Sequence, residues 1–158
     1  MPVVAATSAG ILLHRRAGDA IEVLLVHPGG PFWTKKDLGA WSIPKGEVGE
    51  DEEPRACALR ELEEELGSVL GLAPDDLTEL GTIRQKGGKL VHCWAAEADF
   101  DPATLRSNTF TMEWPPRSGR EREFPEVDRA EWFDVEQARR KINAAQAELL
   151  DRLLDVVA

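Results

Sequence analysis

The sequence predicts one domain of the α/β or α+β class, in which helices are layered against a mixed, largely antiparallel sheet. Short segments rich in apolar and β-branched residues alternate along the chain with segments of helical periodicity, and such interleaving is typical of layered folds. The chain has 158 residues, of which 42% are hydrophobic. This is enough for one buried core and most simply forms one domain spanning residues 1–158.

The first part of the chain predicts a hairpin followed by a loop. Residues 3–14 and 21–27 are apolar or alternating, and residues 15–19 between them have the composition of a turn. We expect a loop over residues 29–39 and a short strand over residues 41–44.

The middle of the chain predicts a helix and two strands. The helix is expected at residues 53–66 and is followed by a loop at residues 73–76. Strands are expected at residues 77–85 and 90–97, joined by a turn at residues 86–89.

The last part of the chain begins with a long irregular segment. Residues 102–124 have no clear periodicity, although part of this segment can be strand or helix. Residues 127–133 predict the last strand and residues 135–141 a short helix. A terminal amphipathic helix is expected over residues 144–157, with four leucines facing inward, namely Leu149, Leu150, Leu153 and Leu154.

Composition excludes several classes of protein. The net charge of −10 argues against nonspecific binding to nucleic acid or to an anionic membrane, because both need a basic surface. The N-terminal residues resemble a strand rather than a signal peptide, and no later segment approaches a membrane span. Cys57 and Cys93 have neither pairing nor metal-ligand spacing, so a reduced, cytoplasmic location is expected.

The helix at residues 53–66 has distinct start and stop signals. Pro54 suits a first turn, where its missing N–H is no loss, and Gly67 suits the position just after the last turn. One apolar stripe runs along the helix, formed by Leu59, Leu62 and Leu66.

The charges at the end of this helix have the wrong sign for its dipole. A helix C-terminus favours Lys or Arg, but Glu61, Glu63, Glu64 and Glu65 lie there instead. Each like-charge pair at i, i+3 or i, i+4 costs about 0.2–0.5 kcal/mol. Two interpretations follow, a solvated acidic face or a site for a hard divalent cation such as Mg²⁺ or Mn²⁺.

The spacing of the motif distinguishes these interpretations. Gly46 is followed six residues later by Glu52, and eight residues beyond Glu52 a cluster begins at Arg60. The segment resembles the signature of the Nudix hydrolases, and it fills eight of nine specified positions, namely Gly46, Glu52, Arg60, Glu61, Leu62, Glu64, Glu65 and Gly67. Ser68 stands where the family prefers an apolar residue, and we expect Val69 or Leu70 to supply the missing packing.

The resemblance implies a fold and a metal-dependent reaction. The fold is an α/β/α sandwich around a mixed sheet, and the reaction is attack of water on phosphorus in a nucleoside diphosphate linked to another group. The resemblance assigns metal binding to Glu61, Glu64 and Glu65, with the carbonyl of Gly46 as a further ligand.

Other signature residues have supporting roles in this resemblance. Arg60 orients the carboxylates, and Glu52 holds Arg60 and the loop before the helix. The general base is open between Glu61 and a later Glu. Our choice for that later Glu is Glu126, just before the last strand, and Glu123 is its competitor. The alternative for each of these two is an ordinary surface carboxylate.

A polyanionic substrate would need local cations on this acidic protein. Lys45 precedes Gly46 and can reach a phosphate. Lys35 and Lys36 follow Trp33, and cations beside an aromatic ring suit a base stacked above its phosphates.

Two further cations are candidates for substrate contacts. Lys89 lies in the turn after the helix, and Arg117 lies in a Pro-rich turn that follows Trp114 and can form a lid. Solvated surface is the alternative for each of them. The three histidines share no spacing and are interpreted as structural, namely His14, His27 and His92.

Residues after the helix point to a substrate class. Lys89, His92 and Trp94 resemble the branch of the family that cleaves dinucleoside polyphosphates and nucleoside triphosphates, although the chain has no Tyr. ADP-ribose or another nucleotide sugar is the alternative substrate. There are two alternative functions, a nucleotide-sensing module without activity and an interaction domain with an incidental acidic helix. The sequence leaves open whether the chain forms a homodimer.

Overall fold

The computed structural model describes residues 7–157, apart from the side chain of Lys86. The strands are β1 (Thr7–Ala17), β2 (Ala20–Pro28), β3 (Lys45–Glu47), β4 (Thr78–Arg84), β5 (Leu90–Glu97), β6 (Thr109–Glu113), β7 (Glu121–Pro125) and β8 (Val127–Asp134). The helices are α1 (Pro54–Leu66), α2 (Val135–Lys141) and α3 (Glu148–Val157). Short 3₁₀ turns lie at Pro74–Asp76, Lys86–Gly88, Pro102–Thr104 and Ala144–Gln146.

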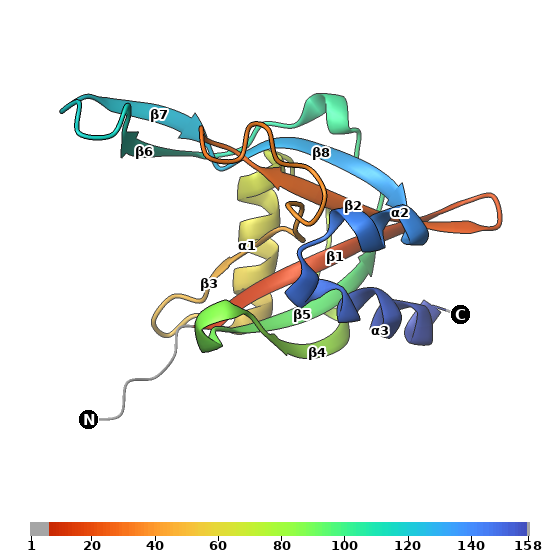
Figure 1. Ribbon diagram of the computed structural model, residues 1–158. Helices are drawn as coiled ribbons and strands as arrows, with labels where there is room; N and C mark the ends of the chain where they lie inside the picture. Colours follow the sequence, from red (N-terminus) through yellow and green to blue (C-terminus); the bar gives the residue numbers. More distant parts are fainter. Residues whose placement is uncertain (1–6, 158) are drawn as a thin grey trace.

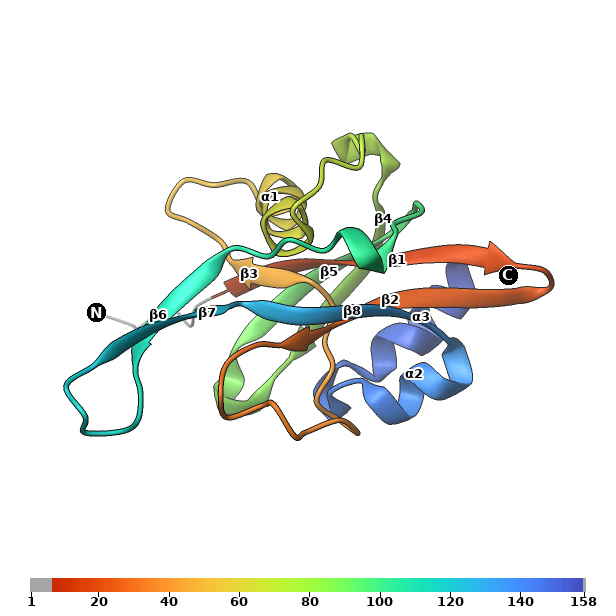
Figure 2. The same cartoon turned by 90° about the horizontal axis from the view of Figure 1, so that it is seen from above.

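A mixed sheet lies at the centre of the fold, as the sequence predicts. Its strand order is β4-β5-β1-β2-β8, with β3 paired to β1. Strands β1 and β5 are parallel, and the other pairs are antiparallel. Helix α1 covers one face of the sheet, and α2 and α3 cover the other (Figure 1, Figure 2). This α/β/α arrangement confirms the predicted fold class.

The sheet has a buried apolar core on each face. One core packs α1 against the sheet through residues such as Ile11, Leu62 and Trp94. The other packs α2 and α3 against the sheet through residues such as Leu12 and Leu149. Both faces of β1 are therefore buried, which agrees with its nearly unbroken apolar sequence.

Two predicted elements near the N-terminus need correction. Residues 3–6 of the first strand lie outside the described residues, and β1 and β2 extend into the predicted turn because Arg15 pairs with Glu22 across the strands. The strand expected at residues 41–44 has only isolated bridges. The paired segment is Lys45–Glu47, which forms β3 on the edge of β1.

The C-terminal half refines one prediction and corrects another. The segment at residues 102–124 contains strands, as the sequence allows: they form a hairpin, β6 and β7, which projects beyond the main sheet (Figure 1). The terminal helix begins at Glu148 rather than at residue 144, because the side chain of Asn143 accepts a hydrogen bond from Ala145 N and caps a separate 3₁₀ turn. No helix within residues 7–157 is long and apolar enough to cross a bilayer.

Candidate functional site

Helix α1 is fixed at both ends. The side chain of Glu53 caps the first turn by accepting a hydrogen bond from Ala56 N, and Gly67 ends the helix in the left-handed conformation with φ of 72°. The free carbonyls of Glu64 and Leu66 accept hydrogen bonds from the backbone N–H groups of residues 108 and 106. The chain after β5 therefore supplies the donors that the acidic helix end lacks.

Arg60 joins the loop before the helix to two acids of the helix. Its Nε and Nη2 donate to both carboxylate oxygens of Glu52, at 2.8 and 3.0 Å. Its Nη1 donates to Glu61 at 3.1 Å and to Glu64 at 3.0 Å. The Arg60 guanidinium lowers the pKa of Glu52 to about 2, with help from the N–H of Gly49. This arrangement fixes the carboxylates of both Glu61 and Glu64.

Strand β3 lies directly against the acids of α1. A Cβ atom at position 46 would clash with the carboxylate of Glu61, so only glycine lets this acid approach the strand. One residue earlier, the backbone N–H of Lys45 donates to Glu65 at 2.9 Å. The strand that the sequence misplaces by a few residues is therefore the floor of the acidic site.

These contacts surround an acidic cavity of about 390 Å³. It is lined by Lys45, Gly46, Glu47, Glu61, Glu64, Glu65, Asn108 and Glu126. Glu126 reaches this cavity because its backbone N–H donates to the carbonyl of Asn108, whose own N–H is bound to the end of α1. Glu123 lies on β7, is exposed and does not line the cavity.

Burial and like charges penalise the ionised acids of this cavity. Burial raises the pKa of Glu65 to about 8, against the N–H of Lys45, and the neighbouring Glu61 and Glu126 add to the increase. Burial also raises the pKa of Glu61, and the charge of Glu64 contributes. Burial lowers the pKa of Lys45, a cation that lines the same cavity, and the charge of Lys89 contributes. A bound cation would relieve this electrostatic cost.

A second cavity adjoins the acidic one. Its volume is about 260 Å³, and it shares three lining residues with the acidic cavity, namely Lys45, Glu65 and Glu126. The other lining residues are apolar, aromatic or uncharged polar, namely Val26, Pro28, Trp33, Ala40, Ser42, Ile43, Gln85, Val127, Asn143 and Gln146. We call it the nucleoside-sized cavity.

The polar side chains of this second cavity differ in what they can still bind. Gln146 is fully buried and satisfied, because it accepts from Ile43 N and donates to the hydroxyl of Ser42. Asn143 uses its amide oxygen to accept from Ala145 N. The amide NH₂ of Asn143 is therefore the group of this residue that can donate a hydrogen bond to a ligand.

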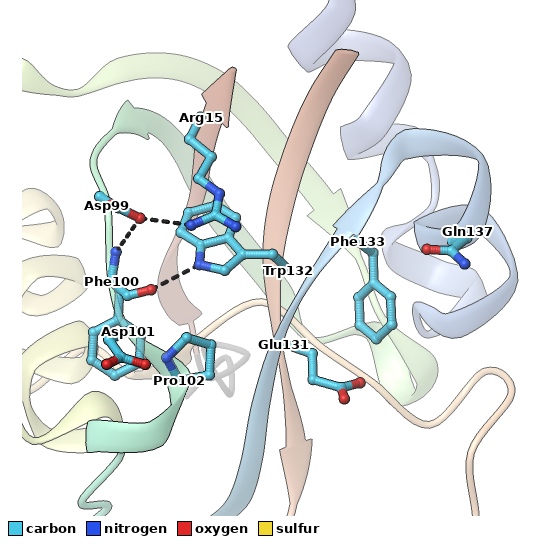
Figure 3. Close-up of a pocket in the computed structure, with 9 residues that line it drawn as sticks. All are labelled: Arg15, Asp99, Phe100, Asp101, Pro102, Glu131, Trp132, Phe133 and Gln137. Carbon is cyan, nitrogen blue, oxygen red and sulfur yellow. Dashed lines mark hydrogen bonds and ion pairs between the residues drawn. The ribbon is translucent and has the colours of Figure 1, made fainter. Parts of the chain in front are cut away.

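A cavity larger than these two lies elsewhere and is not the site of the signature acids (Figure 3). Its volume is about 700 Å³. The guanidinium of Arg15 stacks on the ring of Trp132, 4.2 Å from its centroid, and donates to Asp99 at 2.7 Å. The indole N–H of Trp132 donates to the carbonyl of Phe100. These groups contact one another and connect β1 and β8 to the segment that follows β5.

The remaining predicted substrate contacts lie at different distances from the site. Trp33 lines the nucleoside-sized cavity, and Lys36 lies over its ring at 5.1 Å. Lys89 is at the rim, paired with Glu47 at 3.2 Å. Lys35 and Arg117 line neither cavity; Arg117 lies in the exposed turn between β6 and β7.

Several lining residues were not predicted from the sequence. Asn108 and Asn143 lie in segments that only the tertiary fold brings to the site. Gln146 has a sequence signal that could have identified it, because it is a polar residue just before the apolar terminal helix. The structure shows that it is buried. The residue that compensates for Ser68 is Leu70, which packs against the core, whereas Val69 is 78% exposed.

The acidic cavity has the chemistry of a site for a hard divalent cation. Its ligand atoms are carboxylate and carbonyl oxygens, the type that Mg²⁺ and Mn²⁺ prefer. Within the described residues, no three acidic, His or Cys side chains are close enough together to hold a metal ion between them as they stand. Arg60 and the N–H of Lys45 hold one oxygen each of Glu61, Glu64 and Glu65. The residues fit the ion by type and location.

Comparisons with known proteins identify the family of this chain. The NUDIX domain family matches residues 5–153. The RNA pyrophosphohydrolase of Gluconacetobacter diazotrophicus is 43% identical over 54 residues, which cover 32% of this chain and only 30% of that protein.

Solved structures show the same fold at low sequence identity. The C. elegans Ap4A hydrolase in a binary complex has a TM-score of 0.65 and 23% identity, over 95% of this chain and 97% of that chain. The NUDIX domain of Shewanella oneidensis NrtR complexed with ADP ribose has a TM-score of 0.65 and 17% identity, over 99% of this chain and 90% of that chain. From the family match over almost its whole length, the chain belongs to the NUDIX family.

Proposed function

We propose that this protein is a hydrolase that cleaves a diphosphate bond in a nucleoside polyphosphate, either a dinucleoside polyphosphate or a nucleoside triphosphate, with the help of a divalent cation. The observation that carries the proposal is that the acidic cavity and the nucleoside-sized cavity share Lys45, Glu65 and Glu126. One molecule can therefore place its phosphates in the acidic cavity, next to the divalent cation, and its nucleoside in the nucleoside-sized cavity.

The residues that would hold Mg²⁺ or Mn²⁺ are Glu61, Glu64 and Glu65, with the carbonyl of Gly46 as a further ligand. When bound, such an ion polarises phosphoryl oxygens and lowers the pKa of a bound water. Arg60 positions Glu61 and Glu64, because one guanidinium nitrogen binds both. The support for this assignment is the carboxylate-rich lining of the cavity, which includes no His or Cys, and the electrostatic cost of its ionised acids.

The chain's own residues supply the proton transfer and part of the charge compensation. Glu126 accepts a proton from the attacking water while the water oxygen forms a bond to phosphorus. The bridging P–O bond breaks, and the leaving phosphate oxygen takes the electron pair. Lys45, shared by both cavities, offsets charge on the transferred group.

The nucleoside-sized cavity supports a nucleotide rather than inorganic pyrophosphate. Trp33 offers a ring for stacking, and Lys36 lies over this ring. The amide NH₂ of Asn143 can donate to an acceptor on the base. A diphosphate without a nucleoside would leave this cavity unused, so it should be a poorer substrate.

ADP-ribose is the second candidate substrate. The observation that favours it is the shared fold with the NrtR NUDIX domain, which was solved complexed with ADP ribose. A sensing module without activity is disfavoured because Glu61, Glu64 and Glu65 are all present.

A substrate panel tests the proposal. Diadenosine tetraphosphate, ATP, dGTP, ADP-ribose, NADH and pyrophosphate are incubated with the protein and Mg²⁺ or Mn²⁺, and products are resolved by anion-exchange chromatography. Glu64→Gln and Glu63→Gln are the matched pair, because Glu63 is exposed on the same turn and lines neither cavity. We expect nucleotide turnover that Glu64→Gln reduces by about 10² or more and Glu63→Gln leaves intact. Equal activity of both variants on every compound contradicts the site assignment.

A 5′-triphosphorylated RNA oligonucleotide belongs in the same panel, because one relative is named an RNA pyrophosphohydrolase. The net charge of −10 predicts that this polyanion is a poorer substrate than free nucleotides at low ionic strength. Preferred cleavage of the RNA would show that charge repulsion does not limit the substrate.

A further inference from the structure

His27, at the end of β2, is fully buried between two hydrogen-bond acceptors. Its Nδ1 lies 2.7 Å from a carboxylate oxygen of Asp128, and its Nε2 lies 2.7 Å from the backbone carbonyl oxygen of Lys36. The ring packs edge-on against Trp41, with 5.2 Å between centroids. None of these contacts involves the acidic cavity.

The two contacts fix the number of protons on the pair. A backbone carbonyl can only accept, so Nε2 of His27 must carry a hydrogen. If Nδ1 then had a lone pair, it would face the ionised carboxylate of Asp128 at 2.7 Å, which is repulsive. The pair therefore retains one shared proton, on Nδ1 or on the carboxyl, and His27 donates to Lys36.

A β-bulge places Asp128 against His27. In the register of β2 and β8, His27 pairs with Arg129 and Pro28 with Val127, so Asp128 is the extra residue. A bulge re-aims a side chain next to a functional site. The same short segment carries Glu126 at its start, where it lines the acidic cavity.

Lys36 connects this hydrogen bond to the wall of the nucleoside-sized cavity. Its backbone N–H donates to the carbonyl of Trp33 at 3.0 Å, and its ammonium lies over the Trp33 ring. Trp33 lines the nucleoside-sized cavity. We propose that His27 is a positioning residue, which together with Asp128 and its shared proton holds the loop at residues 29–39 so that Trp33 faces the bound nucleoside. This inference rests on the proposed function for the identity of the ligand.

Other charged groups surround the pair from each packed element. Arg129 on β8 lies 4.0 Å from Asp128 and stacks over Trp41. Asp37 in the loop accepts from the indole N–H of Trp41 and pairs with Lys141 of α2. These groups are the same in all variants used below.

Asp128→Asn separates positioning from simple packing. The amide of Asn can donate to Nδ1, so neutral His27 can still donate from Nε2 to Lys36. This variant should hold the loop. His27→Phe keeps a ring against Trp41 but has no N–H donor, so it should release the loop.

The experiment is NMR of the ligand-free chain. Nitrogen-15 shifts of His27 report which ring nitrogens carry hydrogen, and the Trp33 indole, assigned with Trp33→Phe, reports the loop. We expect hydrogen on Nε2 in both the wild type and Asp128→Asn, with the same Trp33 signal in both. In His27→Phe the Trp33 signal should move.

A Trp33 signal that His27→Phe leaves unchanged, or a His27 ring without hydrogen on Nε2, overturns the inference. Kinetics with diadenosine tetraphosphate provides the second readout. His27→Phe should raise KM up to about tenfold, the equivalent of one hydrogen bond, and leave kcat nearly unchanged. A lower kcat with unchanged KM overturns positioning. Absence of turnover in the wild type would instead contradict the proposed function, since the NMR readout needs no substrate.

Discussion

Gly46 of β3 and Glu61 of α1 approach so closely that a methyl group at position 46 would overlap the Glu61 carboxylate. The backbone at Gly46 does not require a left-handed conformation, so the need for glycine comes from this approach alone. The pair brings a strand residue and a helix carboxylate to the same wall of the acidic cavity.

Gly46→Ala should therefore damage activity far more than stability. The atoms that must move are the far end of the flexible Glu61 side chain, so the fold loses little. The carboxylate leaves its position in the cavity, and we expect a fall in kcat/KM of about 10² or more. Turnover and thermal melting of the same preparation test this, and an active Gly46→Ala enzyme would contradict the role of Glu61.

Arg60→Lys should weaken the site although it keeps the charge. A lysine cannot donate to both oxygens of Glu52 and still reach Glu61 and Glu64, as the guanidinium does. Losses of supporting contacts around a metal site typically cost about 10–100-fold. The matched control is Arg55→Lys on the same helix, whose side chain contacts only a distant carbonyl at 3.5 Å among its described hydrogen bonds. Equal Mn²⁺ affinity of both variants would argue against the positioning role of Arg60.

Glu126→Gln should reduce kcat, and Glu123→Gln should not. Glu126 lines the acidic cavity, whereas Glu123 is exposed on β7. Loss of a general base lowers the rate by about 10²–10⁴. Single-turnover kinetics on the preferred nucleotide measures the effect. A normal rate in Glu126→Gln would return the general base to Glu61.

Glu65 should make the metal-free protein less stable at alkaline pH. Burial raises its pKa in the folded state to about 8, from a reference value of 4.5. Such a carboxyl contributes stability that is complete below 4.5 and is lost as pH rises through about 8. Thermal melting in chelator should therefore decline over this interval more steeply for the wild type than for Glu65→Gln.

Mg²⁺ should reverse this decline, because a ligand that binds only the folded protein raises its melting temperature. The gain should be largest at the alkaline end, where Glu65 is ionised. Parallel melting curves for the wild type and Glu65→Gln, with or without Mg²⁺, would exclude Glu65 as the source of the pH dependence.

Elements with local signals could be predicted from the sequence. Helix α1 begins and ends within a residue of the prediction because Pro54 and Gly67 act within its own turns. Strand β5 and helix α2 agree with the prediction at both ends. Strand β3 could not be predicted, since its three residues become a strand only through pairing with β1.

The site divides in the same way. The acids on α1 could be identified because their spacing lies within one helix. Asn108 and Asn143 could not, because backbone hydrogen bonds between distant segments bring them to the cavities. The choice between Glu123 and Glu126 depends on where β7 ends, which the polar sequence of the hairpin does not indicate.

Calorimetric titration with Mn²⁺ tests the central claim most directly, namely that the acids at the end of α1 form a divalent-cation site. The wild type and Glu63→Gln should both show saturable uptake, and Glu64→Gln should bind at least about tenfold more weakly. Absence of saturable uptake by the wild type, or uptake that Glu64→Gln leaves unchanged, would contradict it.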